Sequence, residues 1–201
     1  MSRSKHTLGP FVAFHGCDEA VGESVLAGKA KLKPSENEYD WLGPGTYFWV
    51  DSPERGLAWA QELSQRKRGK TKTPSVKTPF VIGALIHPGL CLNLTDYGVM
   101  QELADAHKFL ASAAAKAKAD LPKNTHQASG VFLRRSLDCA VIKTVHELRE
   151  EAELDPYDTV YGVFEEGEEL YPGAGFKKRT HVQIAVRNPD CIIGYFRVAG
   201  V

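Results

Sequence analysis

Hydrophobic positions along the chain follow two rhythms, which predict strands toward both ends and helices between them. Short apolar or alternating runs predict strands at residues 11–15, 46–50, 80–86, 90–94, 157–164, 181–186 and 191–198. Apolar residues three or four positions apart predict helices at residues 18–27, 53–65, 99–117 and 137–148. This order of elements predicts the α+β fold class.

Length and composition change this picture little. The 201 residues fit one domain, and we expect the helical pattern over residues 96–150 to be an insertion in it. Hydrophobic residues make up 43% and charged residues 25%, which is typical of a globular protein with a core of useful size. The formal net charge is zero, so attraction to nucleic acid or to an anionic membrane would need a local patch.

The cysteines and the N-terminal residues bear on the compartment. Cys17, Cys91, Cys139 and Cys191 are scattered, and no two have the C-x-x-C spacing of a zinc or redox site. The first residues lack the apolar stretch of a signal peptide, and no run approaches the roughly 18 apolar residues of a membrane helix. We therefore expect a cytoplasmic protein with reduced thiols and no membrane partner.

Two short motifs contain the candidate chemistry. Phe14-His15-Gly16 ends the first strand, and Gly43-Pro44-Gly45-Thr46-Tyr47-Phe48 leads into the second. On its own, a His-Gly pair is more often a core histidine followed by a turn glycine. Tyr47 and Phe48 should point to opposite faces of their strand, so one aromatic ring can serve the core while the other faces a cleft. Trp59, on the following helix, is a candidate wall of the same pocket, with core packing as the alternative.

Together these motifs resemble the NAD-binding core of the ADP-ribosyltransferases, in the branch of the poly(ADP-ribose) polymerases and diphtheria toxin. The stretch from Tyr157 and the run Thr180-His181-Val182-Gln183-Ile184 resemble a bacterial branch of the same superfamily. The resemblance covers residues 11–95 and 157–197. It implies a split β-sandwich of two small packed sheets with flanking helices.

The resemblance also implies roles for individual residues. His15 would bond the adenosine ribose of NAD, the Gly16 backbone would bond the nicotinamide amide, and Tyr47 would stack on nicotinamide. NAD would be the co-substrate and no metal would be needed. The catalytic set implied is His15, Tyr47 and Gln183, and the NAD-binding set is His15, Gly16, Tyr47 and Trp59.

Gln183 departs from the family pattern, which has a glutamate at this strand position. A glutamate there stabilises the positive ribose as nicotinamide leaves, whereas Gln183 can accept the same hydrogen bond without the negative charge. Three explanations compete. Gln183 suffices for a single transfer, which we favour; or a carboxylate of Glu165, Glu166, Glu168 or Glu169 folds back into the site; or the domain binds NAD without turning it over. A solvated loop is the simplest interpretation of the four glutamates. His181, on the same strand face as Gln183, is a candidate acceptor contact.

Several positive segments bear on the acceptor. The basic loop from Arg66 to Lys77 would neutralise phosphates, although it lacks interleaved aromatic residues and is also typical of a solubilising loop. The loop over residues 171–176 lies where this superfamily places its substrate-recognition loop. The resulting hypothesis is an NAD-dependent mono-ADP-ribosyltransferase acting on a protein or nucleic acid, a toxin or defence enzyme with an antitoxin partner. The alternatives are an NAD glycohydrolase and a catalytically silent module that binds NAD or ADP-ribose.

Overall fold

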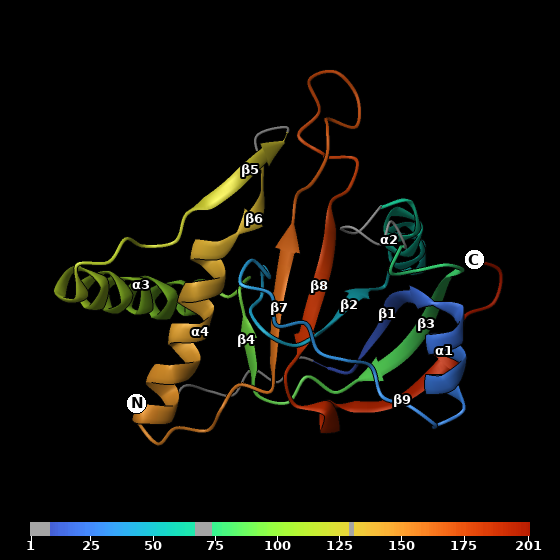
Figure 1. The fold of residues 1–201 in the computed structure, drawn as a ribbon, viewed down its shortest axis with the longest axis horizontal. Coiled ribbons are helices and arrows are strands. Elements are labelled where there is room, and N and C mark those ends of the chain that lie inside the picture. Colours follow the sequence, from blue (N-terminus) through green and yellow to red (C-terminus); the bar gives the residue numbers. More distant parts are fainter. Residues whose placement is uncertain (1–8, 67–73, 129–130) are drawn as a thin grey trace.

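The chain folds into one large sheet with helices packed around it (Figure 1). The computed structural model describes residues 9–66, 74–128 and 131–201. The sheet contains β1 (Phe11–Asp18), β2 (Thr46–Val50), β3 (Pro79–Ile86), β4 (Cys91–Asn93), β7 (Thr159–Phe164), β8 (His181–Val186) and β9 (Ile192–Arg197). The helices are α1 (Glu19–Leu26), α2 (Pro53–Gln65), α3 (Tyr97–Ala117) and α4 (Ser136–Glu151), with a short 3-10 turn at Pro189–Cys191. The predicted α+β class is confirmed.

The strand order shows where the sheet is weakest. The order is β4-β7-β8-β2-β1-β3-β9, and all neighbours are antiparallel except β4 and β7. β1 pairs with β3 along its whole length, from Phe11 opposite Ile86 to Asp18 opposite Pro79. Its register with β2 contains only Ala13 opposite Val50 and Phe14 opposite Trp49. The β1–β2 junction is therefore a narrow seam between two well-paired halves.

The sheet bends sharply at this seam. Phe11 of β1 stacks on Tyr161 of β7 with ring centroids 5.3 Å apart, although β8 and β2 lie between these strands. In a flat sheet, three strand spacings would separate them by about 14 Å. The two halves therefore face each other over one core, whose members include Ala13, Phe48, Ile82, Ile86, Ile184 and Val186. The expected two packed sheets are, in their hydrogen bonding, one bent sheet.

A second core lies under the helical insertion. Leu92, Val160 and Ala185 of the sheet pack there against Val141, Ile142 and Val145 of α4, with α3 outside them. Of the apolar residues that gave α4 its helical pattern, Val141 and Val145 are buried, and Leu137 and Leu148 are partly buried. α1 packs on the first core, where a Cβ at Gly22 would lie 2.4 Å from the ring of Phe80.

The insertion over residues 96–150 differs from the prediction because it contains a hairpin between its two helices. The hairpin consists of β5 (Asn124–Ala128) and β6 (Val131–Arg135). The Trp41 indole donates to the Leu133 carbonyl at 3.2 Å, and the Arg135 guanidinium lies 3.8 Å from the Trp41 ring centroid. In the described part of the chain, no helix has the length and apolarity needed to cross a membrane.

Candidate functional site

The regular pairing of β1 with β2 stops before Gly16. Asp51 N donates to Val12 O at 3.0 Å, so the peptide groups of Val12 face β2. Because these groups alternate along a strand, those of Phe14 and Gly16 face β2 as well. The β1–β2 register ends at Phe14, one repeat before Gly16. The Gly16 N–H and C=O therefore face the side of β2 where the pairing has stopped, although Gly16 itself is buried. We call this unpaired interval between the two strands the opening.

His15 is held at the opening by the backbone of β2. Its Nδ1 lies 2.8 Å from the Tyr47 carbonyl oxygen. A carbonyl only accepts, so Nδ1 carries the proton and Nε2 keeps a lone pair that can accept from a hydroxyl. Burial lowers the pKa of His15, and the bond to Tyr47 opposes this only in part. The imidazole is therefore a neutral acceptor at ordinary pH.

The Tyr47 hydroxyl closes the turn that leads into its own strand. It accepts from Leu42 N at 2.9 Å and donates to Gly43 O at 2.7 Å. Gly43 has φ of +74°, a left-handed conformation that favours glycine. Burial is the main reason that the pKa of Tyr47 is well above its ordinary value. The phenol is thus an un-ionised structural group, and any ligand contact would involve its half-buried ring.

The strand alternation separates the candidate side chains onto two faces. The His15 ring lies 5.6 Å from Phe48, which belongs to the core between the sheet halves. Tyr47 packs against the other core, below the helical insertion. Gln183 lies opposite Trp49 in the β2–β8 register, which places it on the Tyr47 face. The structure joins His15 to the Tyr47 backbone carbonyl, but the His15 ring lies on the opposite face of the sheet from the Tyr47 ring and Gln183.

Gly16 serves a helix contact as well as the opening. A Cβ on Gly16 would lie 2.0 Å from the carbonyl oxygen of Gly56 in α2. The space that the missing side chain leaves is therefore filled by α2. A ligand can therefore reach Gly16 only along its backbone edge.

Trp59 packs against other aromatic and cationic groups. Its ring centroid lies 6.0 Å from that of Trp49, and the Arg66 guanidinium lies 4.8 Å from the Trp59 ring. This arrangement agrees with the packing alternative and leaves the ring half-buried beside β2.

Of the four loop glutamates, Glu166 folds back onto the sheet. It forms an ion pair with Arg55 of α2 at 3.1 Å, with side chains only 17% and 12% exposed. Both charges act on the buried His181: Glu166 raises its pKa and Arg55 lowers it, while burial has the largest, lowering effect. The His181 Nδ1 lies 2.7 Å from the Arg179 carbonyl oxygen. The expectation of a fully solvated loop therefore fails at Glu166.

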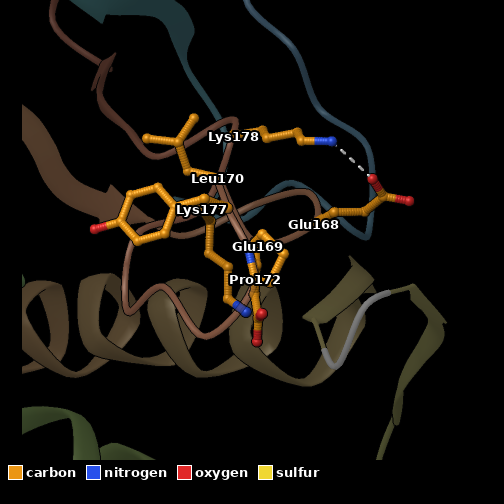
Figure 2. Close-up of a pocket in the computed structure, with 7 residues that line it drawn as sticks. Glu168, Glu169, Leu170, Pro172, Lys177 and Lys178 are labelled. Atoms are coloured by element: carbon orange, nitrogen blue, oxygen red, sulfur yellow. Dashed lines mark hydrogen bonds and ion pairs between the residues drawn. The ribbon is translucent and has the colours of Figure 1, made fainter.

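The other described members of this run stay within the loop. Glu168 pairs with Lys178 at 3.0 Å, and Glu169 accepts from Gly173 N at 3.0 Å. These residues line an open hollow of about 620 Å³, where Figure 2 shows the Glu168–Lys178 pair on one side and Leu170 on another. The hollow is lined entirely by loop residues, so it is separate from the opening at His15.

Two side chains of the site were missed by the sequence analysis. Arg55 and Trp49 both have buried nitrogens with no hydrogen-bond partner among the described residues. Arg55, Trp59, Glu62 and Arg66 recur at helical spacing on α2, a stripe that could have indicated a polar face turned toward the sheet.

The basic loop from Arg66 to Lys77 can be assessed only at its ends, because residues 67–73 lie outside the described residues. Arg66 lies over Trp59 and pairs with Glu62 at 3.6 Å. Within the described ranges, no group of three or more His, Cys, Asp or Glu side chains could hold a metal ion.

Comparisons with protein-family models, with curated proteins and with solved structures gave no match. The fold alone defines the class, which is an α+β protein with a bent seven-stranded sheet.

Proposed function

We propose that the protein is an NAD-dependent mono-ADP-ribosyltransferase whose NAD site is the opening between β1 and β2. The observation that carries the proposal is the end of the β1–β2 register at Phe14, which leaves the Gly16 peptide groups facing the opening. One N–H and one C=O on a strand edge match the acceptor and donor of a carboxamide such as that of nicotinamide. The resemblance of the two motifs to the ADP-ribosyltransferases assigns this contact to the same glycine.

His15 suits the role of a ribose ligand. Its Nδ1 proton is committed to the Tyr47 carbonyl, so Nε2 can accept from a ribose hydroxyl without a change of tautomer. Burial keeps the ring neutral. The same bond links β1 to β2 where the regular pairing has stopped, so the histidine would both hold the opening and line it.

The reaction would break the bond between ribose C1′ and the nicotinamide nitrogen. The bonding electrons leave with nicotinamide and neutralise its positive ring, while positive charge develops on the sugar. A lone pair of the acceptor then forms the new bond to C1′, and the acceptor loses its proton to solvent or to a nearby base. Gln183, beside Trp49 on β8, would orient the ribose through its carbonyl oxygen.

The acceptor would approach from the loop between β7 and β8, which rises beyond the sheet in Figure 1. Leu170, Tyr171 and Phe176 on this loop are 54%, 55% and 67% exposed. Three exposed apolar side chains on one loop are typical of a recognition surface. We propose a macromolecular acceptor, protein or nucleic acid, at this loop.

The test is incubation of the protein with adenine-labelled NAD and a cell extract. We expect label on a macromolecule together with free nicotinamide. Nicotinamide without labelled macromolecule would select the glycohydrolase. NAD binding without consumption would select the silent module, which the uncharged Gln183 favours. Folded protein that neither binds nor consumes NAD would contradict the proposal.

A gain-of-function variant sharpens this test. Gln183→Glu would place a carboxylate where positive charge develops, and single electrostatic groups of this kind change rates by about 10²-fold. We expect faster nicotinamide release from Gln183→Glu and slower release from Gln183→Leu, which has similar size but no acceptor.

A further inference from the structure

Arg55 is a half-buried arginine whose guanidinium nitrogens are largely without hydrogen bonds among the described residues. Its Nη2 donates to Glu166 Oε2 at 3.1 Å, and the side chain is 12% exposed. Its Nε and Nη1 are buried without an acceptor among the described residues. A guanidinium has five N–H groups, and buried donors are almost always satisfied in folded proteins. Among the described residues, the surroundings of Arg55 therefore offer too few acceptor atoms.

Trp49 adds a second unsatisfied donor next to the first. The Arg55 guanidinium carbon lies 5.6 Å from the centroid of the Trp49 ring. Trp49 is 4% exposed, and its indole nitrogen has no partner among the residues described. The two donors come from successive elements, β2 and α2. A group that brought several oxygen atoms to this point would satisfy both.

Glu166 shows what chemistry the arginine accepts. Its carboxylate is the anion now paired with Arg55, and it comes from the start of the loop between β7 and β8. The base of this loop is attached to α2 a second time, through Arg179 and Glu62 at 2.9 Å. Both attachments are ion pairs, so a competing anion can replace the carboxylate without disrupting an apolar core.

We propose that Arg55 and the Trp49 indole form a binding site for a phosphate group, and that Glu166 occupies it in the ligand-free protein. Phosphate offers more acceptor oxygens than a carboxylate and matches the bidentate geometry of a guanidinium. Binding would release the Glu166 side chain, while the Arg179–Glu62 ion pair would keep the base of the β7–β8 loop attached to α2. The site goes beyond the proposed transferase activity, because it requires only an accessible phosphate.

The probe is inorganic pyrophosphate, titrated calorimetrically into the full-length protein at low ionic strength. We expect saturable binding by the wild type. Arg55→Gln should weaken it at least about 10-fold, and Trp49→Phe, which keeps the ring and loses the N–H, about threefold. Glu166→Gln should strengthen it about three- to tenfold, because the internal competitor loses its charge.

Arg197→Gln is the matched control. It makes the same change in charge on β9, where Arg197 pairs with Glu23 and is 58% exposed, and it should bind like the wild type. A variant that simply folds poorly cannot bind more tightly, so Glu166→Gln distinguishes competition from damage. Absence of wild-type binding at millimolar pyrophosphate, or weaker binding by Glu166→Gln, would overturn the proposal.

Two competitors identify the source of the phosphate. Displacement of pyrophosphate by ADP-ribose would assign the site to a dinucleotide, whereas displacement by a short single-stranded oligonucleotide would assign it to a nucleic-acid acceptor. Because none of these measurements needs NAD turnover, an inactive protein that binds pyrophosphate would contradict the proposed function and leave this site standing.

Discussion

Two half-buried arginines, Arg149 of α4 and Arg55 of α2, differ in how fully they are hydrogen-bonded. Arg149, near the end of α4, donates from Nε and Nη2 to the Asp155 carbonyl at 3.0 and 2.7 Å, and lies 3.6 Å from Glu102. Arg55 has one bonded nitrogen and two buried ones without described partners. Arg149 fixes the turn after α4, whereas Arg55 keeps the unused donors that the proposed phosphate would bond.

Each arginine lies near a histidine. His146 is flanked by Arg149 and Arg187, and burial followed by these two charges lowers its pKa to about 3. The buried His181 lies near two opposite charges, and their effects on its pKa oppose each other: Glu166 raises it and Arg55 lowers it. The α4 region therefore holds a neutral histidine under strong positive potential, whereas the α2 region balances its charges. This difference predicts distinct responses to mutation and to acid.

The largest expected effect is at Arg149. Arg149→Ala removes two hydrogen bonds to Asp155 and the contact with the Tyr157 ring, 4.1 Å from the guanidinium. We expect the free energy of unfolding to fall by about 2–4 kcal/mol, measured by urea denaturation. A loss below about 1 kcal/mol would show that these bonds do not hold the α4–β7 connection.

Acid should destabilise the protein through His146. Its folded pKa of about 3 lies below the ordinary value of 6.5, so the unfolded chain binds the proton first as the pH falls. Its contribution to stability is therefore complete above pH 6.5 and is lost toward pH 3. We expect about 1–2 kcal/mol to be lost between pH 6.5 and pH 5 through this group. His146→Phe should remove that part of the slope; an unchanged slope would contradict the assignment.

The ion pair between Arg55 and Glu166 should be dispensable for folding. The double variant Arg55→Met, Glu166→Gln removes both charges and the unsatisfied guanidinium donors together. Replacing a buried ion pair with neutral groups is often nearly neutral, so we expect unfolding within about 1 kcal/mol of the wild type. Arg55→Met alone leaves Glu166 unpaired and should be less stable than the double variant. If the single and the double variant lose the same free energy of unfolding, and lose as much as Arg149→Ala, then Arg55 is as important for folding as Arg149.

The smallest effect is expected at the exposed pair of Arg197 and Glu23, with side chains 58% and 43% exposed. Exposed ion pairs contribute about 0–1 kcal/mol. Arg197→Gln should change the free energy of unfolding by less than about 0.5 kcal/mol in the same urea experiment. A larger loss of unfolding free energy would mean that the exposure of an arginine does not predict how much its contacts stabilise the fold.

Local patterns in the sequence predicted most of the elements. The bounds of β2, α2 and β8 follow the aromatic run, the proline at the first helical position and the alternation at residues 181–186. The β5–β6 hairpin was missed because Asn124–Ala128 has no apolar alternation. Its place is fixed by distant contacts such as Trp41 with Leu133.

The candidate site could be predicted only in part. His15, Tyr47 and Gln183 come from motifs, but the bend at the β1–β2 seam depends on contacts between distant strands, such as Phe11 with Tyr161. The pairing of Arg55 with Glu166 joins positions 111 residues apart, and nothing local distinguishes Glu166 from its neighbours. Such pairings are set by the topology of the sheet.

We propose that the opening between β1 and β2 binds the nicotinamide end of NAD. A crystal structure with a non-hydrolysable NAD analogue tests it most directly. We predict density for the carboxamide against the N–H and C=O of Gly16, with a ribose hydroxyl near Nε2 of His15. An analogue bound elsewhere, or a Gly16 backbone paired with β2, would contradict the account.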